Sequence, residues 1–420
     1  MKKYSFFAIV AISVFITYSI AIAAESQSSA IKWDLWVDGP HLRGANTFQR
    51  RIYLELDGAE FMGPGPLGPP YTQADFDLLA AWGANFVNIS HPGLFSENPP
   101  YEVDLDVQEN LDTLLEMIKE ADMFAVISFR TGPGRSEFGL CCFEEVGDWY
   151  DESYLNNEVW RDENAQEAWS KMWAYTAQRY KDNPIVVGYD LMVEPNSNEI
   201  WLDEWDQEVF YAEYANTLYD WNQLYPKIVS AIRKTDSSTP IIVGGMAYSS
   251  IDWLPWIEPI DDVYVIYAAH QYAPHGYTHQ WRDSDYSYPG EMDLDWDNRD
   301  DPFNRAWLEN ELFSIIDSFV SNHDVAVTVN EFGLIRWVPG AAAFVADEIE
   351  LLEARGINHA LWQWQTSWEQ LQEENDAFNF RHGPDPDHHE DVSTSDLIEV
   401  IKSNWSKNTH RPSNTTFANP

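Results

Sequence analysis

The stretch VAVTVNEFG, Val325 to Gly333, decides how this sequence is interpreted. Its alternating and β-branched apolar residues predict a short buried strand. The strand ends on a carboxylate, Glu331, and Phe332-Gly333 begins a loop. A charge at the end of a buried strand is costly unless the protein uses it, and in a (β/α)8 barrel that end is where active sites are built. The alternative is a structural carboxylate at a strand exit.

A second stretch has the same plan. PIVVGYDLMVEP, Pro184 to Pro195, is an apolar run followed by Glu194 and then by a proline that ends the pattern. Two glutamates at the ends of two separate strands supply what glycoside hydrolysis needs, one as the acid and one as the nucleophile. The second strand therefore favours a catalytic interpretation of both carboxylates.

Strand and helix patterns alternate along the rest of the chain, including one long helix expected at about 204–234. Continuous apolar strands of this kind are typical of a parallel sheet that is buried on both faces. We therefore predict an α/β fold, a closed (β/α)8 TIM barrel that forms a single domain with long βα loops. The expected strands are 42–46, 85–90, 123–129, 184–194, 240–245, 263–270, 325–331 and 357–364.

The chain begins with the pattern of a secretory signal peptide. Met1-Lys2-Lys3 is a positive n-region, an apolar run follows, and Ala21-Ile22-Ala23 is a small-x-small cleavage site. A membrane anchor is the alternative, but the run is slightly short for one. We expect residues 1–23 to be removed, residues 24–407 to form the catalytic domain and residues 408–420 to be a flexible tail. The mature protein is then secreted or periplasmic, with no membrane contact.

The composition is strongly acidic. Asp and Glu number 69 against 25 Lys and Arg, for a formal net charge of -44. Nucleic acids and anionic membranes bind cationic surfaces, so both are excluded as partners. The only cysteines are the neighbours Cys141 and Cys142, which excludes a disulfide scaffold. Adjacent cysteines poorly match the usual disulfide geometry, so two thiols are favoured over a vicinal disulfide.

Side chains at the predicted strand ends share one mouth of the barrel. Carboxylates among histidine, tyrosine, arginine and tryptophan suit a sugar site, because polar groups bind hydroxyls and aromatic rings cover the sugar face. Taken singly, each histidine or tryptophan is more typical of a core residue, but their joint occurrence at strand ends favours a site. The strand-end set comprises Asn46, Asn88, His91, Arg130, Glu194, His270, Tyr272, Glu331, Trp362 and Trp364.

Five motifs in order, LRGAN, GYDLMVEP, AAHQY, VNEFG and ALWQW, resemble those of glycoside hydrolase family 5, the cellulase and mannanase family. The similarity covers about residues 42–404. It implies that Glu194 is the acid/base and Glu331 the nucleophile. It also implies that Tyr272 contacts the nucleophile beside His270. Trp362 is similar to the tryptophan under the reacting sugar, with Trp364 as the alternative.

Three positions depart from the family pattern. The residue before the acid/base is usually an asparagine that binds the sugar 2-hydroxyl, and here it is Val193. Asn88 stands where an arginine is usual, and Arg130 stands where a histidine is usual. Arg130 could supply the cation that is missing at Asn88. The departures bear on the choice of sugar more than on the reaction.

Two polar loops have some features of cation sites. DLDWDNRDD, 293–301, lacks the glycine and the closing glutamate of an EF-hand. HGPDPDHHED, 382–391, combines histidines with acids and could bind a divalent ion. Both sequences are also typical of solvated loops, and we predict no metal and no cofactor.

The sequence thus predicts an exported retaining β-glycoside hydrolase that acts on a β-linked polysaccharide, as an endo-β-1,4-glucanase or a β-mannanase does. We expect a monomer whose partner is the polysaccharide or oligosaccharide substrate. Two alternatives remain: an exo-β-glycosidase or transglycosylase on the same scaffold, and a carbohydrate-binding protein without turnover. The two glutamates weigh against the second alternative, because binding alone needs no paired carboxylates.

Overall fold

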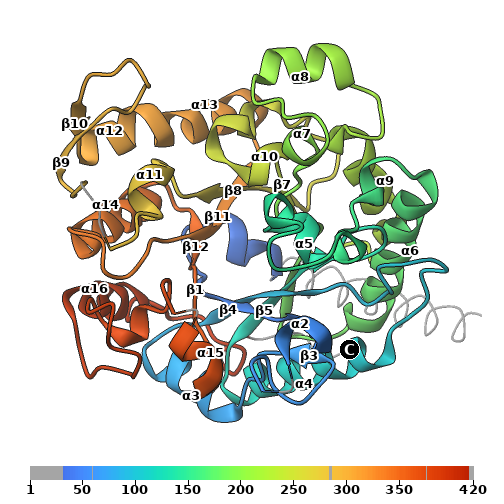
Figure 1. Cartoon of the computed structure of the whole chain (residues 1–420), viewed down its shortest axis with the longest axis horizontal. Helices are drawn as coiled ribbons and strands as arrows, with labels where there is room; N and C mark the ends of the chain where they lie inside the picture. The colour runs from blue at the N-terminus through green and yellow to red at the C-terminus, as the bar shows by residue number, and fades with distance from the viewer. Residues whose placement is uncertain (1–31, 59, 283–285, 375, 416–420) are drawn as a thin grey trace, which may run out of the picture.

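The computed structural model describes residues 32–58, 60–282, 286–374 and 376–415. Eight parallel strands close into a barrel in the order β1-β12-β11-β8-β7-β6-β5-β4, and helices surround these strands in Figure 1. The predicted fold class is confirmed. The barrel strands are β1 (Arg43–Phe48), β4 (Phe86–Pro92), β5 (Phe124–Thr131), β6 (Val186–Asp190), β7 (Ile241–Gly244), β8 (Val265–Gln271), β11 (Ala326–Phe332) and β12 (Asn358–Leu361).

The outer helices form where an apolar stripe follows a capping residue. In α4, the Asp104 side chain accepts from two backbone amides of the first turn, and Leu111, Leu115 and Ile118 are buried against the barrel. The long outer helices are α3 (Gln73–Ala81), α4 (Leu105–Glu120), α6 (Glu163–Tyr180), α9 (Trp221–Arg233), α13 (Ser314–His323), α14 (Ala341–Ala354) and α16 (Asp396–Trp405).

Two connections differ from the predicted alternation. The helix expected at 204–234 is divided into α8 (Gln207–Tyr214) and α9, with Asp220 capping the second. Between β7 and β8 the chain makes only α10 (Met246–Ser249) and a 3-10 helix, Ile251–Trp256, which packs on α13. The eighth outer helix is therefore replaced by a shorter element.

Short elements fill the long loops and rim of the barrel. Two antiparallel pairs, β2 with β3 and β9 with β10, lie outside the barrel. These elements are β2 (Arg50–Arg51), α2 (Leu54–Asp57), β3 (Leu67–Gly68), α5 (Glu137–Leu140), α7 (Ser197–Ile200), α11 (His275–Thr278), β9 (Gly290–Met292), β10 (Asp301–Phe303), α12 (Arg305–Trp307) and α15 (Glu369–Glu374).

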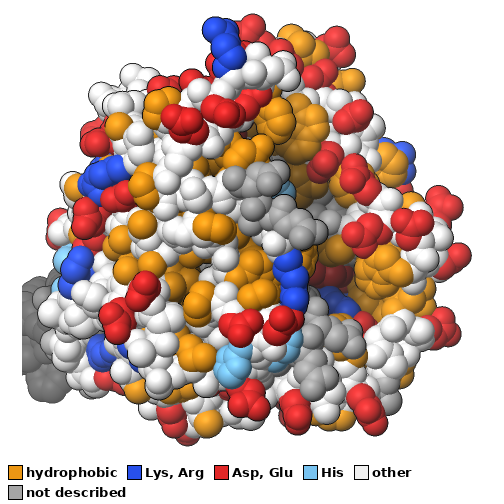
Figure 2. Space-filling model, turned by 60° about the vertical axis from the view of Figure 1, so that its left-hand side comes forward, with side chains coloured by type: hydrophobic (Ala, Val, Ile, Leu, Met, Phe, Trp, Pro, Cys, Tyr) orange, Lys and Arg blue, Asp and Glu red, His pale blue; other side chains and the backbone are white. Residues whose placement is uncertain are grey.

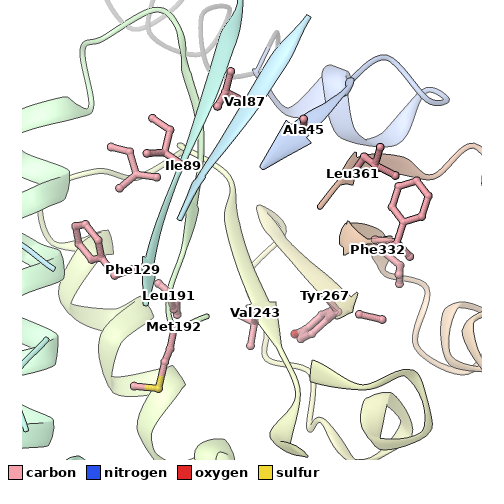
Figure 3. Close-up of a cluster of buried hydrophobic side chains, with 14 of the residues drawn as sticks. Ala45, Val87, Ile89, Phe129, Leu191, Met192, Val243, Tyr267, Phe332 and Leu361 are labelled. Carbon is pink, nitrogen blue, oxygen red and sulfur yellow. The ribbon is translucent and has the colours of Figure 1, made fainter. Parts of the chain in front are cut away.

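Alternation along each strand divides the core into two layers. In β4, Val87 and Ile89 face the helices, together with side chains such as Phe129 and Val243 from other strands (Figure 3). Phe86 instead points into the barrel, where it packs with Phe124 and other apolar side chains. The barrel is thus a packed core, and the functional groups lie at its carboxyl end.

The two ends of the chain bear on the domain prediction. The predicted signal peptide lies outside the described residues. The tail is docked up to residue 415: Asn408 Nδ2 donates to the carbonyl oxygens of Arg43 and Gly83, and Arg411 donates to the carbonyl of Asp122. The prediction of a flexible tail is therefore wrong for residues 408–415, because long-range hydrogen bonds hold them. Within the described ranges, none of the helices has the length and apolar character needed to cross a bilayer.

Candidate active site

Three barrel strands bring two carboxylates to one histidine. Glu331 lies in β11, directly beside His270 of β8 in the sheet register, and Glu194 follows β6. His270 Nδ1 lies 3.0 Å from Glu194 Oε1 and 3.8 Å from Glu331 Oε2. One carboxylate oxygen from each glutamate and a ring nitrogen of His270 all lie within 4.8 Å of one another. The predicted pair is therefore assembled in space.

Tyr272 completes this group. Its hydroxyl donates a hydrogen bond of 2.8 Å to Glu331 Oε1, and its own carbonyl accepts from the Thr278 hydroxyl at 2.6 Å. The ring lies edge-on to Phe378, with centroids 6.3 Å apart. The tyrosine is thus fixed from two sides, and it holds one carboxylate oxygen in place.

The electrostatics of the group follow from burial and proximity. Burial raises the pKa of Glu331 to about 7, and Glu194 adds to this while His270 and Tyr272 oppose it. Burial by itself would lower the pKa of His270, but Glu331 and Glu194 raise it to about 9. The imidazole is therefore protonated at neutral pH, where it stabilises negative charge on both glutamates. Burial also raises the pKa of Tyr272, which remains a donor.

The backbone of Glu194 is held in the left-handed region. Its φ is 56°, a conformation that is costly for a residue with a side chain unless the surroundings impose it. Arg135 is fully buried and donates to the carbonyl oxygens of Val193 at 2.6 Å and of Glu194 at 2.5 Å. Burial lowers the pKa of this guanidinium to about 10, so it is still charged at neutral pH. Arg135 therefore fixes the turn that presents Glu194.

Arg135 was not singled out by sequence reasoning. It closes the turn TGPGR after β5, in which Gly132 and Arg135 hydrogen-bond to each other through the backbone. A basic residue after a Gly-Pro turn at a strand end was the only signal for it. The side chain also lies 3.4 Å from Asn196 Oδ1, and Asn196 Nδ2 donates to the Gly139 carbonyl at 2.9 Å. These contacts join the loops after β5 and β6.

Arg130 is occupied by protein partners. It forms two hydrogen bonds with Glu137, at 2.7 and 2.5 Å, and donates to Ser90 Oγ at 2.9 Å. Its guanidinium also lies over the Phe48 ring, 4.5 Å from the centroid. Arg130 and Glu137 are both buried. Arg130, the cation expected to replace the arginine missing at Asn88, thus pairs with Glu137 of α5. It affects Glu331 only electrostatically, by lowering the pKa of that carboxyl.

Asn88 lies inside the barrel, below the carboxylate pair. Its Nδ2 donates to Asn46 Oδ1 at 2.6 Å, and its Oδ1 accepts from Ser128 Oγ at 3.0 Å. Ser128 and Asn330 both donate to Asp190 Oδ2, at 2.7 and 3.0 Å. This polar layer satisfies groups that would otherwise be costly to bury. Asn88, 1% exposed, belongs to this layer and not to the open mouth.

Two predicted site residues point away from the mouth. His91 is buried between β4 and α4, where its ring nitrogens contact the Pro92 carbonyl at 2.7 Å and Asn110 Oδ1 at 2.9 Å. Trp364 is fully buried and donates from Nε1 to the Asp75 carbonyl beside α3. The prediction that they line the site is wrong, because each side chain takes the helix-facing side of its strand end.

Trp362 is placed differently from Trp364. Its ring is half-buried and lies edge-on to Phe48, with centroids 6.3 Å apart. Its backbone amide donates to the carbonyl of Phe332, the residue after Glu331, at 2.7 Å. Of the two candidate tryptophans, Trp362 is therefore the one hydrogen-bonded to the nucleophile strand.

Val193, at the position where the family pattern has an asparagine, is buried, 3% exposed.

The cysteine pair forms a vicinal disulfide between Cys141 and Cys142. The prediction of two free thiols is wrong: chain adjacency sets the Cα separation at 3.8 Å, and a disulfide joins the two residues nonetheless. The pair follows α5, whose Glu137 holds Arg130.

Figure 2 shows acidic side chains over much of the surface and a hollowed region lined partly by hydrophobic ones.

Comparison with known proteins identifies the family. The profile described as Cellulase (glycosyl hydrolase family 5) matches residues 43–367. The chain belongs to glycosyl hydrolase family 5. This family-5 chain is 24% identical over 322 residues to Endoglucanase C of Acetivibrio thermocellus, covering 70% of this chain and 83% of that protein. It is 24% identical over 265 residues to Cellodextrinase A of Ruminococcus flavefaciens, covering 62% and 68%.

Solved structures show the same barrel. Endoglucanase Cel5A from the hyperthermophilic Thermotoga maritima superposes with a TM-score of 0.60 at 18% identity, covering 89% of this chain and 99% of that one. The structure of Cel5A with a mannotriose substrate superposes with a TM-score of 0.59 at 18% identity, covering 86% and 97%. The protein is thus a glycoside hydrolase with the (β/α)8 fold and a carbohydrate substrate.

Proposed function

We propose that the protein is a retaining β-glycosidase in which Glu331 is the nucleophile and Glu194 the acid/base. The observation that carries this proposal is the approach of the two carboxylates to within 4.8 Å, oxygen to oxygen. Retaining enzymes hold their carboxyl groups about 5–5.5 Å apart, whereas inverting enzymes leave about 6.5–9.5 Å for a water molecule. The short separation leaves room for a covalent intermediate and not for direct attack by water.

The surroundings of each glutamate support these roles. Glu331 is 6% exposed, and its Oε1 is held by Tyr272, which leaves Oε2 to attack the anomeric carbon. The Glu194 side chain is 20% exposed and stands on a turn at the open end of the barrel, where a leaving group can accept its proton. In the first step the Glu331 carboxylate bonds to the anomeric carbon while Glu194 protonates the departing oxygen. In the second, Glu194 takes a proton from water, the oxygen of which replaces Glu331.

The substrate we propose is a β-1,4-linked glucan cleaved internally, with mannan as the alternative. The relatives named as endoglucanases support glucan and endo action, and the solved complexes of Cel5A with cellobiose and with mannotriose support either sugar. Exo action on short chains is the second candidate, favoured by the likeness to a cellodextrinase. A binding protein without turnover is the third, and the assembled carboxylate pair argues against it.

Export and a monomeric state are part of the same proposal. The basic start, the apolar run and the Ala21-Ile22-Ala23 site support secretion or release to the periplasm, where a polysaccharide is accessible. N-terminal sequencing of the protein recovered outside the cytoplasm tests this. A mature chain beginning near Ala24 is expected, and a retained N-terminus would contradict export.

The activity is tested on soluble β-1,4-glucan, β-1,4-mannan and cello-oligosaccharides, with Glu194→Gln and Glu331→Gln as inactive controls. We expect new reducing ends and a rapid fall in glucan viscosity, which indicates internal cleavage. NMR of the first products should show the β-anomer. An initial α-anomer would overturn the retaining mechanism, and equal signals from the Gln variants would overturn the site.

A further inference from the structure

We infer that Asp376, His382 and His389 form a binding site for a divalent transition metal of the zinc type. These residues lie in the long loop between β12 and α16. One ligand atom from each lies within 4.8 Å of the others. His382 Nδ1 is 2.9 Å and His389 Nδ1 is 3.0 Å from the same oxygen, Asp376 Oδ2. The site is separate from the carboxylate pair, and the proposal does not depend on the proposed function.

The loop that carries these residues is held in shape by a buried cation. Arg336, which is 1% exposed, follows the nucleophile strand and donates to the carbonyl oxygens of Asp385 at 2.7 Å and His388 at 2.8 Å. Its Nη2 also donates to Asp376 Oδ2 at 2.5 Å. The two ends of the site are therefore fixed relative to each other before any ion binds.

The convergence on Asp376 exceeds what hydrogen bonding needs. A guanidinium and two imidazole nitrogens all approach one oxygen, Asp376 Oδ2, which offers only about two of the roughly four acceptor positions of the carboxylate. In tetrahedral zinc sites the ligand bonds are about 2.0–2.2 Å, which places ligand atoms about 3.3 Å apart. The observed spacings of 2.9 and 3.0 Å need to open by only a few tenths of an ångström.

Outer contacts are also in place. Ligating histidines commonly use their second nitrogen in a hydrogen bond, and ligating carboxylates are themselves hydrogen-bonded. His382 Nε2 lies 3.0 Å from Asn379 Nδ2, and a half-turn of this side-chain amide would place its oxygen there instead. Arg336 supplies the hydrogen bond to Asp376. The interior position of His382, 0% exposed, keeps water from competing for it.

The ligand set indicates the class of ion. Two imidazoles with one carboxylate suit Zn²⁺ and its neighbours, whereas Ca²⁺ and Mg²⁺ prefer oxygen ligands throughout.

The same loop carries Phe378, whose ring lies 5.1 Å from that of His279 and 6.3 Å from that of Tyr272. An ion bound here would stabilise the loop that packs against the tyrosine of the carboxylate pair. Its role is structural.

The test uses the full, tag-free chain after treatment with a chelator. Zn²⁺ binding is followed by calorimetry and by melting temperature, and Co²⁺ binding by visible absorption, which reports tetrahedral nitrogen and oxygen ligation. His389→Ala is the main variant, because its side chain is one-third exposed and its loss spares the core. His388→Ala is the matched control, since His388 is the adjacent partly buried histidine and contributes only its carbonyl to the loop. His382→Ala is the second variant.

We expect one equivalent of Zn²⁺ to bind the parent chain and His388→Ala and to raise both melting temperatures. Affinity should fall by at least roughly 100-fold in His389→Ala, as expected for loss of a direct ligand when outer contacts alone are worth 10–100-fold. His382→Ala should also lose the Co²⁺ absorption. Equal binding by all variants would assign the ion to the acidic surface and overturn the proposal. The absence of saturable Zn²⁺ binding to the parent chain would also overturn the proposal.

Discussion

The Tyr272 hydroxyl donates a hydrogen bond of 2.8 Å to Glu331 Oε1, and the bond favours the ionised carboxylate. Burial raises the pKa of Glu331 to about 7, and this hydrogen bond is one of the contacts that lower it. A nucleophile must be ionised to attack, so the tyrosine extends activity toward lower pH.

Tyr272→Phe should therefore move the acidic limb of the kcat/KM profile to higher pH, because the carboxylate loses a donor that stabilises its charge. Tyr277→Phe is the matched control, since that hydroxyl donates to the Pro339 carbonyl and not to the pair. Profiles of kcat/KM against pH for the parent and both variants check this. An acidic limb that stays in place in Tyr272→Phe would show that the hydrogen bond does not tune the nucleophile.

Arg135→Lys should lower kcat by about tenfold or more, equivalent to about 1.4 kcal/mol, with little change in KM. A lysine cannot donate to the Val193 and Glu194 carbonyls with the same planar fork. The left-handed turn at Glu194 then loses its support, and the acid/base is misplaced. Arg299→Lys, a substitution at an exposed position, is the control. Steady-state kinetics of both variants separate misplacement of Glu194 from a general effect of replacing arginine by lysine. Parent-like kcat in Arg135→Lys would refute the positioning role.

Arg130→Met should lower the free energy of unfolding by about 3–5 kcal/mol, because it leaves the buried Glu137 charge unpaired. The double variant Arg130→Met/Glu137→Gln should recover part of that loss. Urea denaturation of the parent, Arg130→Met, Glu137→Gln and the double variant gives the coupling energy. Strictly additive effects would mean that the pair is not coupled, and that Arg130 acts mainly elsewhere.

Glu348→Gln should stabilise the protein above pH 5. Glu348 is fully buried in α14, and burial raises its pKa well above 4.5. In the unfolded chain this carboxyl ionises from about pH 4.5 while the folded one stays protonated, so stability falls as pH rises, by about 1.4 kcal/mol per unit. Glutamine keeps the contact with Gln271 without a proton to lose. Melting temperatures from pH 4 to 8 should diverge in favour of the variant, and parallel curves would contradict this account.

The sequence was sufficient for the barrel and for the grouping of Glu194, His270, Tyr272 and Glu331. Apolar runs locate the strands, and parallel strands bring their carboxyl ends to one mouth. The sequence was not sufficient for the direction of each side chain near a strand end. In β4, Asn88 points inward and His91 outward, and a shift of one residue reverses this.

Other misses depend on contacts between distant segments. Arg135 sits in an irregular turn, and its role follows from carbonyls that lie 58 and 59 residues further along the chain. Asn408 is polar, as a loose tail would be, yet it donates to the carbonyl of Arg43 at the other end of the domain. The composition of a short segment does not indicate which distant residues that segment contacts.

Azide rescue tests the assignment of the two glutamates most directly. In Glu194→Ala, an aryl β-glycoside with an activated leaving group needs little protonation and still forms the intermediate on Glu331. Azide, which needs no general base, should then restore turnover and yield the β-glycosyl azide. Glu331→Ala should form no β-glycosyl azide. In Glu331→Ala, azide that takes the place of the missing nucleophile should attack the opposite face and yield the α-glycosyl azide. The β-glycosyl azide from Glu331→Ala, together with the α-glycosyl azide from Glu194→Ala, would reverse the two roles and contradict the central claim.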